Sequence, residues 1–174
     1  MVTISGLPER SEAAPYYFGY IDRIKSEDVV GVLQRQVGEA LPLLRSVTEE
    51  RSLHRYQPGK WSIRELLGHV SDAERVLLYR ALWFARGFDT PLPSFDEKAS
   101  VAAAGSDQVP WSRHVEELRA VREATVAFFK NLPAEGWMRR GTASEKVFTT
   151  RALAYVIAGH LDHHLAVLRE RYLS

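Results

Sequence analysis

The stretch SIRELLGHVSDAERVLLYRALWFAR, residues 62–86, decides the fold of this chain. Its first four residues fit a capping box, in which Ser62 accepts from the third helical amide and Glu65 accepts from the Ser62 amide. Apolar residues then recur at three- and four-residue spacing, which is typical of one buried helix face. These are Leu66, Val70, Ala73, Val76, Leu77 and Leu82. Gly87 is a natural helix stop, so the stretch predicts one long amphipathic helix.

The same periodicity predicts three further helices, over about 27–51, 112–132 and 150–172. Ser26 is the expected N-cap of the first, and Pro42 interrupts its apolar run, so that helix can kink or break there. No segment indicates a sheet. We therefore expect an all-α chain, a single domain over residues 1–174 that folds as a four-helix bundle.

The connection between the second and third helices, residues 87–110, is too long for two adjacent antiparallel helices. It is long enough to cross the end of a bundle and start the next helix in the same direction, with a short helical turn near 98–104. Long connections often cover binding sites, so Asp96 is a candidate to approach one.

The bulk composition excludes several classes of protein. The chain has 174 residues, a formal net charge of +1 and no cysteine, so disulfides, thiolate metal sites and a cysteine nucleophile are ruled out. Balanced charge predicts neither nucleic acid nor a membrane surface as a partner. The start of the chain does not resemble a secretory signal and no segment is apolar enough to span a bilayer, so we expect a cytoplasmic protein.

Three of the six histidines lie on predicted buried faces. His160 and His164 form an H-x3-H pair, which places two imidazoles one turn apart on the same helix face. His69 lies on the apolar stripe of the helix over 62–86. If these two helices are antiparallel, the three rings fall near one level. The pattern alone leaves two interpretations open, a divalent metal site or hydrogen-bonded core histidines. His54 and His114 have no partner at a useful spacing and are expected at the surface.

The chain resembles the DinB-like (DinB/YfiT) superfamily of metal-binding four-helix bundles. The resemblance lies in GKWSIRELLGHVSDAERVLLYRAL (59–82), TPLPSFD (90–96) and RALAYVIAGHLDHHLAVLRERYL (151–173). It implies an up-down-down-up bundle, a homodimer, and a metal triad on His69, His160 and His164. His163 falls where the family often has a further histidine that is not a ligand.

Three imidazoles without a fourth protein ligand are typical of a catalytic site with an open coordination position. They suit zinc, nickel, copper or iron, and we expect zinc or nickel first, with iron or manganese as alternatives. Relatives include bacillithiol- and mycothiol-dependent enzymes, so the resemblance implies a thiol S-transferase or a hydrolase acting on a small-molecule substrate. The alternative is a non-catalytic protein in which the metal has a structural or regulatory role.

The sequence offers no clear general base. Glu65 and Asp72 can orient the His69 ring, but capping and ordinary surface charge explain them more simply. Three arginines can bind an anionic thiol, but a solvated helix face explains them more simply. Four tryptophans can line a pocket, but a role as buried anchors explains them more simply. The arginines are Arg75, Arg80 and Arg86, and the tryptophans are Trp61, Trp83, Trp111 and Trp137.

Overall fold

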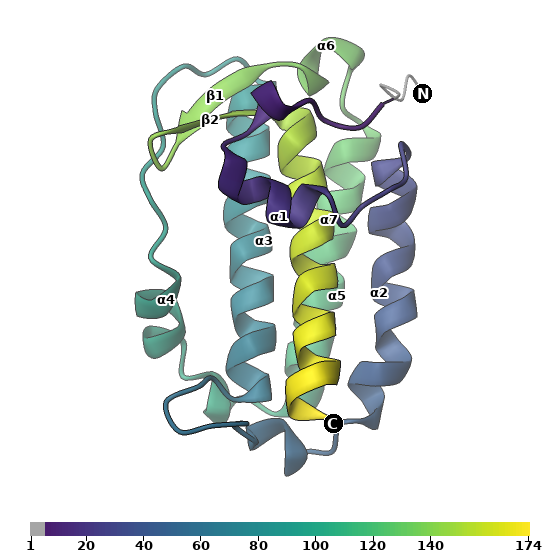
Figure 1. Cartoon of the computed structure of the whole chain (residues 1–174), viewed down its shortest axis with the longest axis vertical. Coiled ribbons are helices and arrows are strands. Elements are labelled where there is room, and N and C mark those ends of the chain that lie inside the picture. The colour runs from purple at the N-terminus through teal and green to yellow at the C-terminus, as the bar shows by residue number, and fades with distance from the viewer. Residues whose placement is uncertain (1–5) are drawn as a thin grey trace.

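Four long helices form the body of the protein in the computed structural model, which describes residues 6–174 (Figure 1). They are α2 (Val29–Ser46), α3 (Ile63–Ala85), α5 (Trp111–Lys130) and α7 (Thr150–Val167), and a π-helical turn, Leu168–Tyr172, extends α7. The expected four-helix bundle is confirmed. No helix within the described residues is both long enough and apolar enough to cross a membrane.

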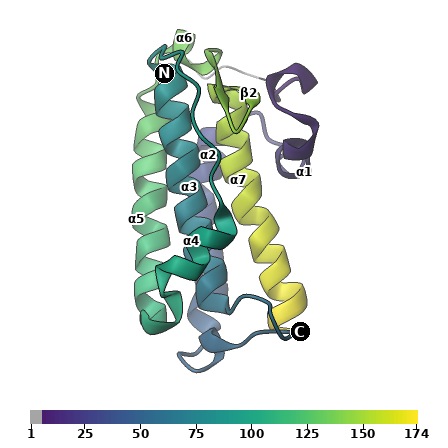
Figure 2. The ribbon, with the colours of Figure 1, turned by 90° about the vertical axis from the view of Figure 1, so that its left-hand side faces the viewer.

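The order of the helices around the bundle differs from their order in the chain. Helices α2 and α7 run in one direction, and α3 and α5 run in the other (Figures 1 and 2). Helix α3 packs mainly against α5 and α7, and α2 packs against the same two helices. The successive helices α2 and α3 therefore lie at opposite corners, and α3 and α5 are parallel, as the long connection between them predicted.

Side-chain hydrogen bonds cap the starts of α3 and α2. The Ser62 hydroxyl accepts from the Glu65 amide at 3.0 Å, and the Glu65 carboxylate accepts from the Ser62 amide at 2.8 Å, which confirms the capping box. The expected start of the first helix was wrong by two residues, because the Asp28 carboxylate caps α2 by accepting from the Gly31 amide. Helix α2 continues through Pro42 without breaking and ends earlier than expected, at Ser46.

The connection from α3 to α5 runs down the outside of the bundle (Figure 2). It carries the short helix α4 (Glu97–Ala104), close to the expected helical turn, and α4 packs against α3. The Asp96 carboxylate accepts from the Ala99 amide at 3.0 Å and so caps α4. Glu97 follows directly as the first residue of α4.

A β-hairpin lies between α5 and α7, after the short helix α6 (Ala134–Trp137), so the expectation of no sheet was wrong. Strands β1 (Arg140–Ala143) and β2 (Lys146–Thr149) pair antiparallel with Ala143 opposite Lys146. The two turn residues both adopt left-handed backbone, with φ of 52° at Ser144 and 60° at Glu145. Two-residue hairpin turns with positive φ normally use asparagine or glycine, so the sequence carried no turn signal here.

The interior contains two apolar clusters with polar side chains between them. On α7 the boundary lies between Ala158 and Leu161, where His160 is placed, and on α3 it lies between Val70 and Leu77, where Glu74 is placed. Both polar side chains are buried. The middle of the bundle therefore has the polar groups that a site requires.

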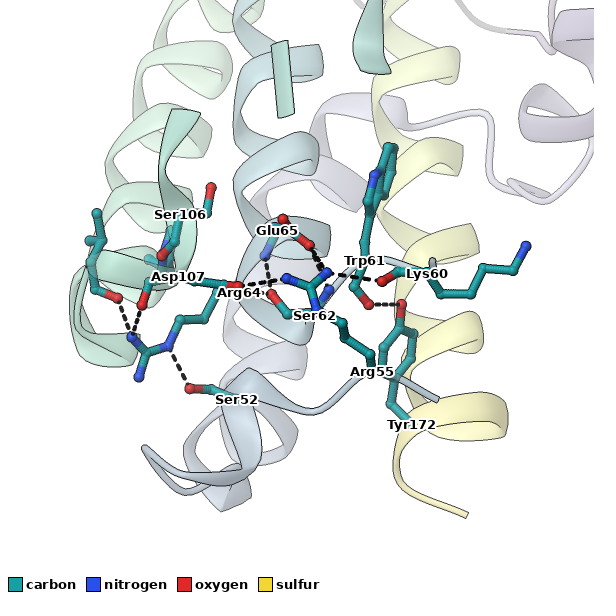
Figure 3. Close-up of polar contacts among 12 residues, drawn as sticks. Ser52, Arg55, Lys60, Trp61, Ser62, Arg64, Glu65, Ser106, Asp107 and Tyr172 are labelled. Carbon is teal, nitrogen blue, oxygen red and sulfur yellow. Dashed lines mark hydrogen bonds and ion pairs between the residues drawn. The ribbon is translucent and has the colours of Figure 1, made fainter. Parts of the chain in front are cut away.

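A hydrogen-bond network closes the end of the bundle where α3 begins (Figure 3). Arg55 pairs with both Glu65 and Asp107, and the Tyr172 hydroxyl donates to the Trp61 carbonyl at 2.8 Å. These contacts tie the residues before α3 to the connection before α5 and to the turn after α7. They also fix the backbone at Trp61, whose ring lies beside His69 with centroids 4.9 Å apart.

Candidate metal centre

The structure brings His69, His160 and His164 together at the α3–α7 interface. The Nε2 atom of His160 lies 3.2 Å from Nε2 of His69 and 3.1 Å from Nε2 of His164. All three potential ligand atoms fall within 4.8 Å of one another. The one-turn spacing on α7 aligns two rings, and the antiparallel packing of α3 brings the third to their level. This arrangement has the compactness that a single ion requires, and metal binding itself stays a prediction.

Burial keeps the three imidazoles neutral. Desolvation lowers the pKa of His69, and it lowers the pKa of His160 well below the ordinary value, with further lowering by His164 and His69. Desolvation and the neighbouring His69 and His163 lower the pKa of His164 to about 3. A neutral imidazole has a free lone pair, which is the form that binds a metal ion.

The hydrogen bonding of the rings fits an ion at their centre. The Nδ1 atoms of His69 and His164 are buried and have no partner among the described residues. If these nitrogens carry the ring protons, the Nε2 lone pairs face one another at about 3 Å, an unfavourable arrangement that a cation would stabilise. The donor set therefore fits a divalent metal.

Aromatic packing positions the rings in place of hydrogen bonds. Trp61 lies against His69, and the Tyr20 ring lies edge-on to His160 with centroids 5.3 Å apart. His163 also packs against Tyr20, at 5.6 Å, and is not part of the compact set of ligand atoms. The resemblance to the family likewise sets His163 apart from the three proposed ligands, and its exclusion from a metal site stays a prediction.

The structure adds a carboxylate that the sequence did not identify. Glu97 Oε2 lies 3.9 Å from Nε2 of His69, with its side chain 56% exposed. Asp96, the candidate expected from this connection, instead caps α4, and the next residue approaches His69. Asp72 accepts from Arg75 and Ser100, and no hydrogen bond joins it to His69 among the described residues. The only available signal for Glu97 was its place in a long connection.

Two cavities border the histidines. One of about 130 Å³ is lined by His69 and His160, and one of about 690 Å³ is lined by His164. Glu97 lines both, so the carboxylate lies where the two cavities approach the triad. The triad is therefore accessible to small molecules.

Several other expectations change with the structure. His114 was expected at the surface but is buried, and its Nε2 lies 2.9 Å from the Ser106 carbonyl oxygen, because the long connection covers it. Arg80 was assigned to a solvated helix face but is only 5% exposed. Arg75 does lie on an exposed face, in an ion pair with Glu117.

Comparisons with known proteins agree with this architecture. A family model described as the DinB superfamily matches residues 33–168. Among solved structures, the chain is similar to YfiT from Bacillus subtilis, with a TM-score of 0.73 and 20% sequence identity. The match covers 95% of this chain and 91% of that chain, and YfiT is described as "a probable metal-dependent hydrolase with an unusual four-helix bundle topology". At that identity the likeness establishes the fold alone. No curated protein matches the sequence. The family match covers most of the chain, and the chain therefore belongs to the DinB superfamily.

Proposed function

We propose that this protein is a metal-dependent hydrolase that holds one divalent ion on His69, His160 and His164 and uses Glu97 as its general base. The observation that carries the proposal is the Glu97 carboxylate, 3.9 Å from the His69 Nε2 at the edge of a cavity. The description of YfiT as a probable metal-dependent hydrolase supports the same reaction class.

The three imidazoles would hold the ion and leave a coordination position for a small ligand. A bound divalent ion lowers the pKa of water and polarises a carbonyl oxygen, which is the chemistry a hydrolase needs. Zinc or nickel is the ion we propose first, because both favour imidazole nitrogen.

Glu97 has the exposure and position that a base requires. Its side chain is 56% exposed and lines the cavity that His69 and His160 also line, so the carboxylate is accessible to a water molecule there. In hydrolysis the water oxygen bonds to the substrate carbonyl carbon while Glu97 takes the water proton. The bond to the leaving nitrogen or oxygen then breaks, and Glu97 returns the proton to that atom.

A second candidate function is transfer of an electrophilic group to a low-molecular-weight thiol. The observation that favours it is the 690 Å³ cavity beside His164, which carries Lys60, Lys98 and Arg171 on its walls. These cations suit an anionic thiol cofactor. A non-catalytic role for the metal is a weaker alternative, because the triad adjoins two cavities and is not sealed.

Two measurements test this function. Elemental analysis of the untagged protein should find about one equivalent of divalent metal. The metal-loaded protein should then hydrolyse small activated esters or amides, and Glu97→Gln should lose that activity while it keeps its metal. Activity that appears only when a thiol is added would replace hydrolysis with thiol transfer. Absence of metal after reconstitution would refute both.

The expected homodimer also stays a proposal, based on resemblance to the family. Sedimentation equilibrium of the purified protein tests it directly, because the chain mass is 19.7 kDa and a dimer has twice that mass.

A further inference from the structure

Four arginines are buried in the part of the chain that the structure describes, and three of them have a carboxylate partner. Arg122 pairs with Glu74, Arg151 pairs with Glu12, and Arg64 pairs with Glu49. Arg80 is as deeply buried as Arg64, each being 5% exposed. Among residues 6–174 no carboxylate lies within ion-pair distance of Arg80. Within residues 6–174, three buried guanidiniums therefore have a counter-charge and the fourth has none.

Neutral groups hold the Arg80 side chain in place. Its Nη2 donates to the Pro93 carbonyl oxygen at 3.1 Å and to the Ser144 hydroxyl at 2.9 Å. Pro93 belongs to the α3–α4 connection and Ser144 to the hairpin turn, so two separate segments fix the guanidinium. Neutral acceptors orient a cation without neutralising it, and a buried cation without an anion is unfavourable. Burial accordingly lowers the pKa of Arg80.

The hairpin turn that supplies Ser144 has a conformation that its residues disfavour. Ser144 and Glu145 both have positive φ, which glycine or asparagine adopts more readily. Unfavourable backbone conformations persist where the surrounding structure fixes them, and they cluster at functional sites. Here the consequence is that the Ser144 hydroxyl faces the guanidinium and lines the same cavity.

Arg80 shares the 130 Å³ cavity with His69 and His160. Residues 69 and 80 lie on one face of α3, because 11 residues make close to three full turns, and their Cα atoms are about 16 Å apart along the axis. The cavity wall includes the apolar side chains of Ala73, Val76, Leu77 and Val156, and three tyrosines, Tyr16, Tyr17 and Tyr20, also line it. The cavity is smaller than the roughly 300–1,000 Å³ of typical ligand pockets, so it suits a small molecule.

We propose that Arg80 binds the carboxylate of a small aliphatic substrate, whose uncharged hydrolysable group then lies at the histidine triad. The reaction in this inference rests on the proposed function, whereas the carboxylate-binding site is inferred from the surroundings of Arg80 alone. The guanidinium matches a carboxylate geometrically, and the apolar side chains in the wall accommodate a short carbon chain. Glu97 at the opposite end repels a negative charge, so the cavity accepts such a substrate in one orientation. The substrate class is a short-chain acid that carries an ester or amide.

The test compares pentanoate with pentanamide, which has the same shape and no charge. Binding to the metal-loaded protein is followed by chemical-shift titration of the backbone amides that line the cavity. We expect pentanoate to bind at least tenfold more tightly than pentanamide. Arg80→Met should abolish this preference and retain the metal, and Arg80→Lys should retain part of it. Arg86→Met, an exposed arginine at the end of the same helix, is the matched control and should keep the full preference.

The chelator-treated wild-type protein separates this proposal from the proposed function. A carboxylate held by Arg80 keeps its preference over the amide after the ion is removed, whether or not the protein is a hydrolase. Equal binding of pentanoate and pentanamide to the wild type would overturn the proposal. So would a preference that survives in Arg80→Met but disappears with the metal, because the carboxylate would then bind the ion. If Arg80→Met fails to fold, the wild type and Arg80→Lys still decide the outcome.

Discussion

Glu74 on α3 and Arg122 on α5 form a two-pronged ion pair inside the bundle. Arg122 Nε lies 2.8 Å from Oε1 of Glu74, and Nη2 lies 2.9 Å from Oε2, with both side chains 3% exposed. Arg122 also donates to the Leu33 carbonyl and to the Gln36 side chain of α2. One guanidinium therefore joins three of the four helices, and its charge is fully compensated.

We expect Arg122→Met to destabilise the protein by about 3–5 kcal/mol, because it leaves the Glu74 carboxylate buried and unpaired. Urea unfolding followed by circular dichroism measures the change. Arg119→Met is the matched control: it removes an exposed ion pair to Glu123 on the same helix and should cost less than about 1 kcal/mol. Equal losses of unfolding free energy in the two variants would show that the buried ion pair stabilises the protein no more than the exposed one does.

Removal of His160 should eliminate the metal. His160 Nε2 lies between the Nε2 atoms of His69 and His164, so His160→Ala removes the central donor. Elemental analysis should fall from about one equivalent to background, and a chelator should lower the melting temperature of the wild type but not of the variant. His163→Ala, next to the site but outside the compact set, should keep its metal. Loss of metal from His163→Ala would contradict the assigned ligands.

Glu97→Gln should lower kcat by about 10²–10⁴ if Glu97 is the general base, because the amide cannot accept the proton. The metal content should stay unchanged, since the Glu97 oxygen lies outside the group of three ligand atoms. Steady-state hydrolysis measures the effect, and Glu116→Gln, an exposed residue on α5, serves as the control. Wild-type activity in Glu97→Gln would exclude the base role.

The stability of the metal-free protein should fall as the pH falls below about 6.5. Desolvation lowers the folded-state pKa of His69 and His160, and it lowers that of His164 to about 3, whereas the unfolded chain titrates near 6.5. Between these values the unfolded state binds protons that the folded state does not, so acid favours unfolding, by up to about 1.4 kcal/mol per pH unit for each histidine. Urea unfolding between pH 7.5 and 4.5 measures the slope, and His164→Gln should reduce it. A flat profile would show that the rings are protonated when folded.

Glu145→Gly should stabilise the protein by up to about 1 kcal/mol. Glu145 has φ of 60° and is exposed, so glycine removes a disfavoured conformation without removing a buried contact. The gain is reduced by the greater freedom of glycine in the unfolded chain. Thermal unfolding measures the change, and Glu135→Gly in α6 should act in the opposite direction. Destabilisation by Glu145→Gly would mean that the side chain itself supports the turn.

The elements that could be predicted from sequence are those with local causes. The helix over 62–86 has its cap, its apolar stripe and its glycine stop within its own residues, and the H-x3-H pair owes its geometry to a single helix. The hairpin was missed because its strands have four residues each and its turn contains no glycine or asparagine. The positions of Glu97 and the buried His114 were not predicted, because both depend on the course of the α3–α5 connection. An irregular connection has no sequence periodicity from which its course can be predicted. The burial of Arg80 depends on Pro93 and Ser144, which are distant in the chain.

The placement of the three histidines on α3 and α7 also sets an order of events during protein synthesis. His69 emerges from the ribosome long before His160 and His164, which lie 91 and 95 positions later in the sequence. Until α7 has been translated, the nascent chain offers only one of the three imidazoles of the site. The ion that we propose for this site would therefore find its full set of ligands only after α7 has been synthesised, and a shortage of metal would leave the synthesis of the first three bundle helices unchanged.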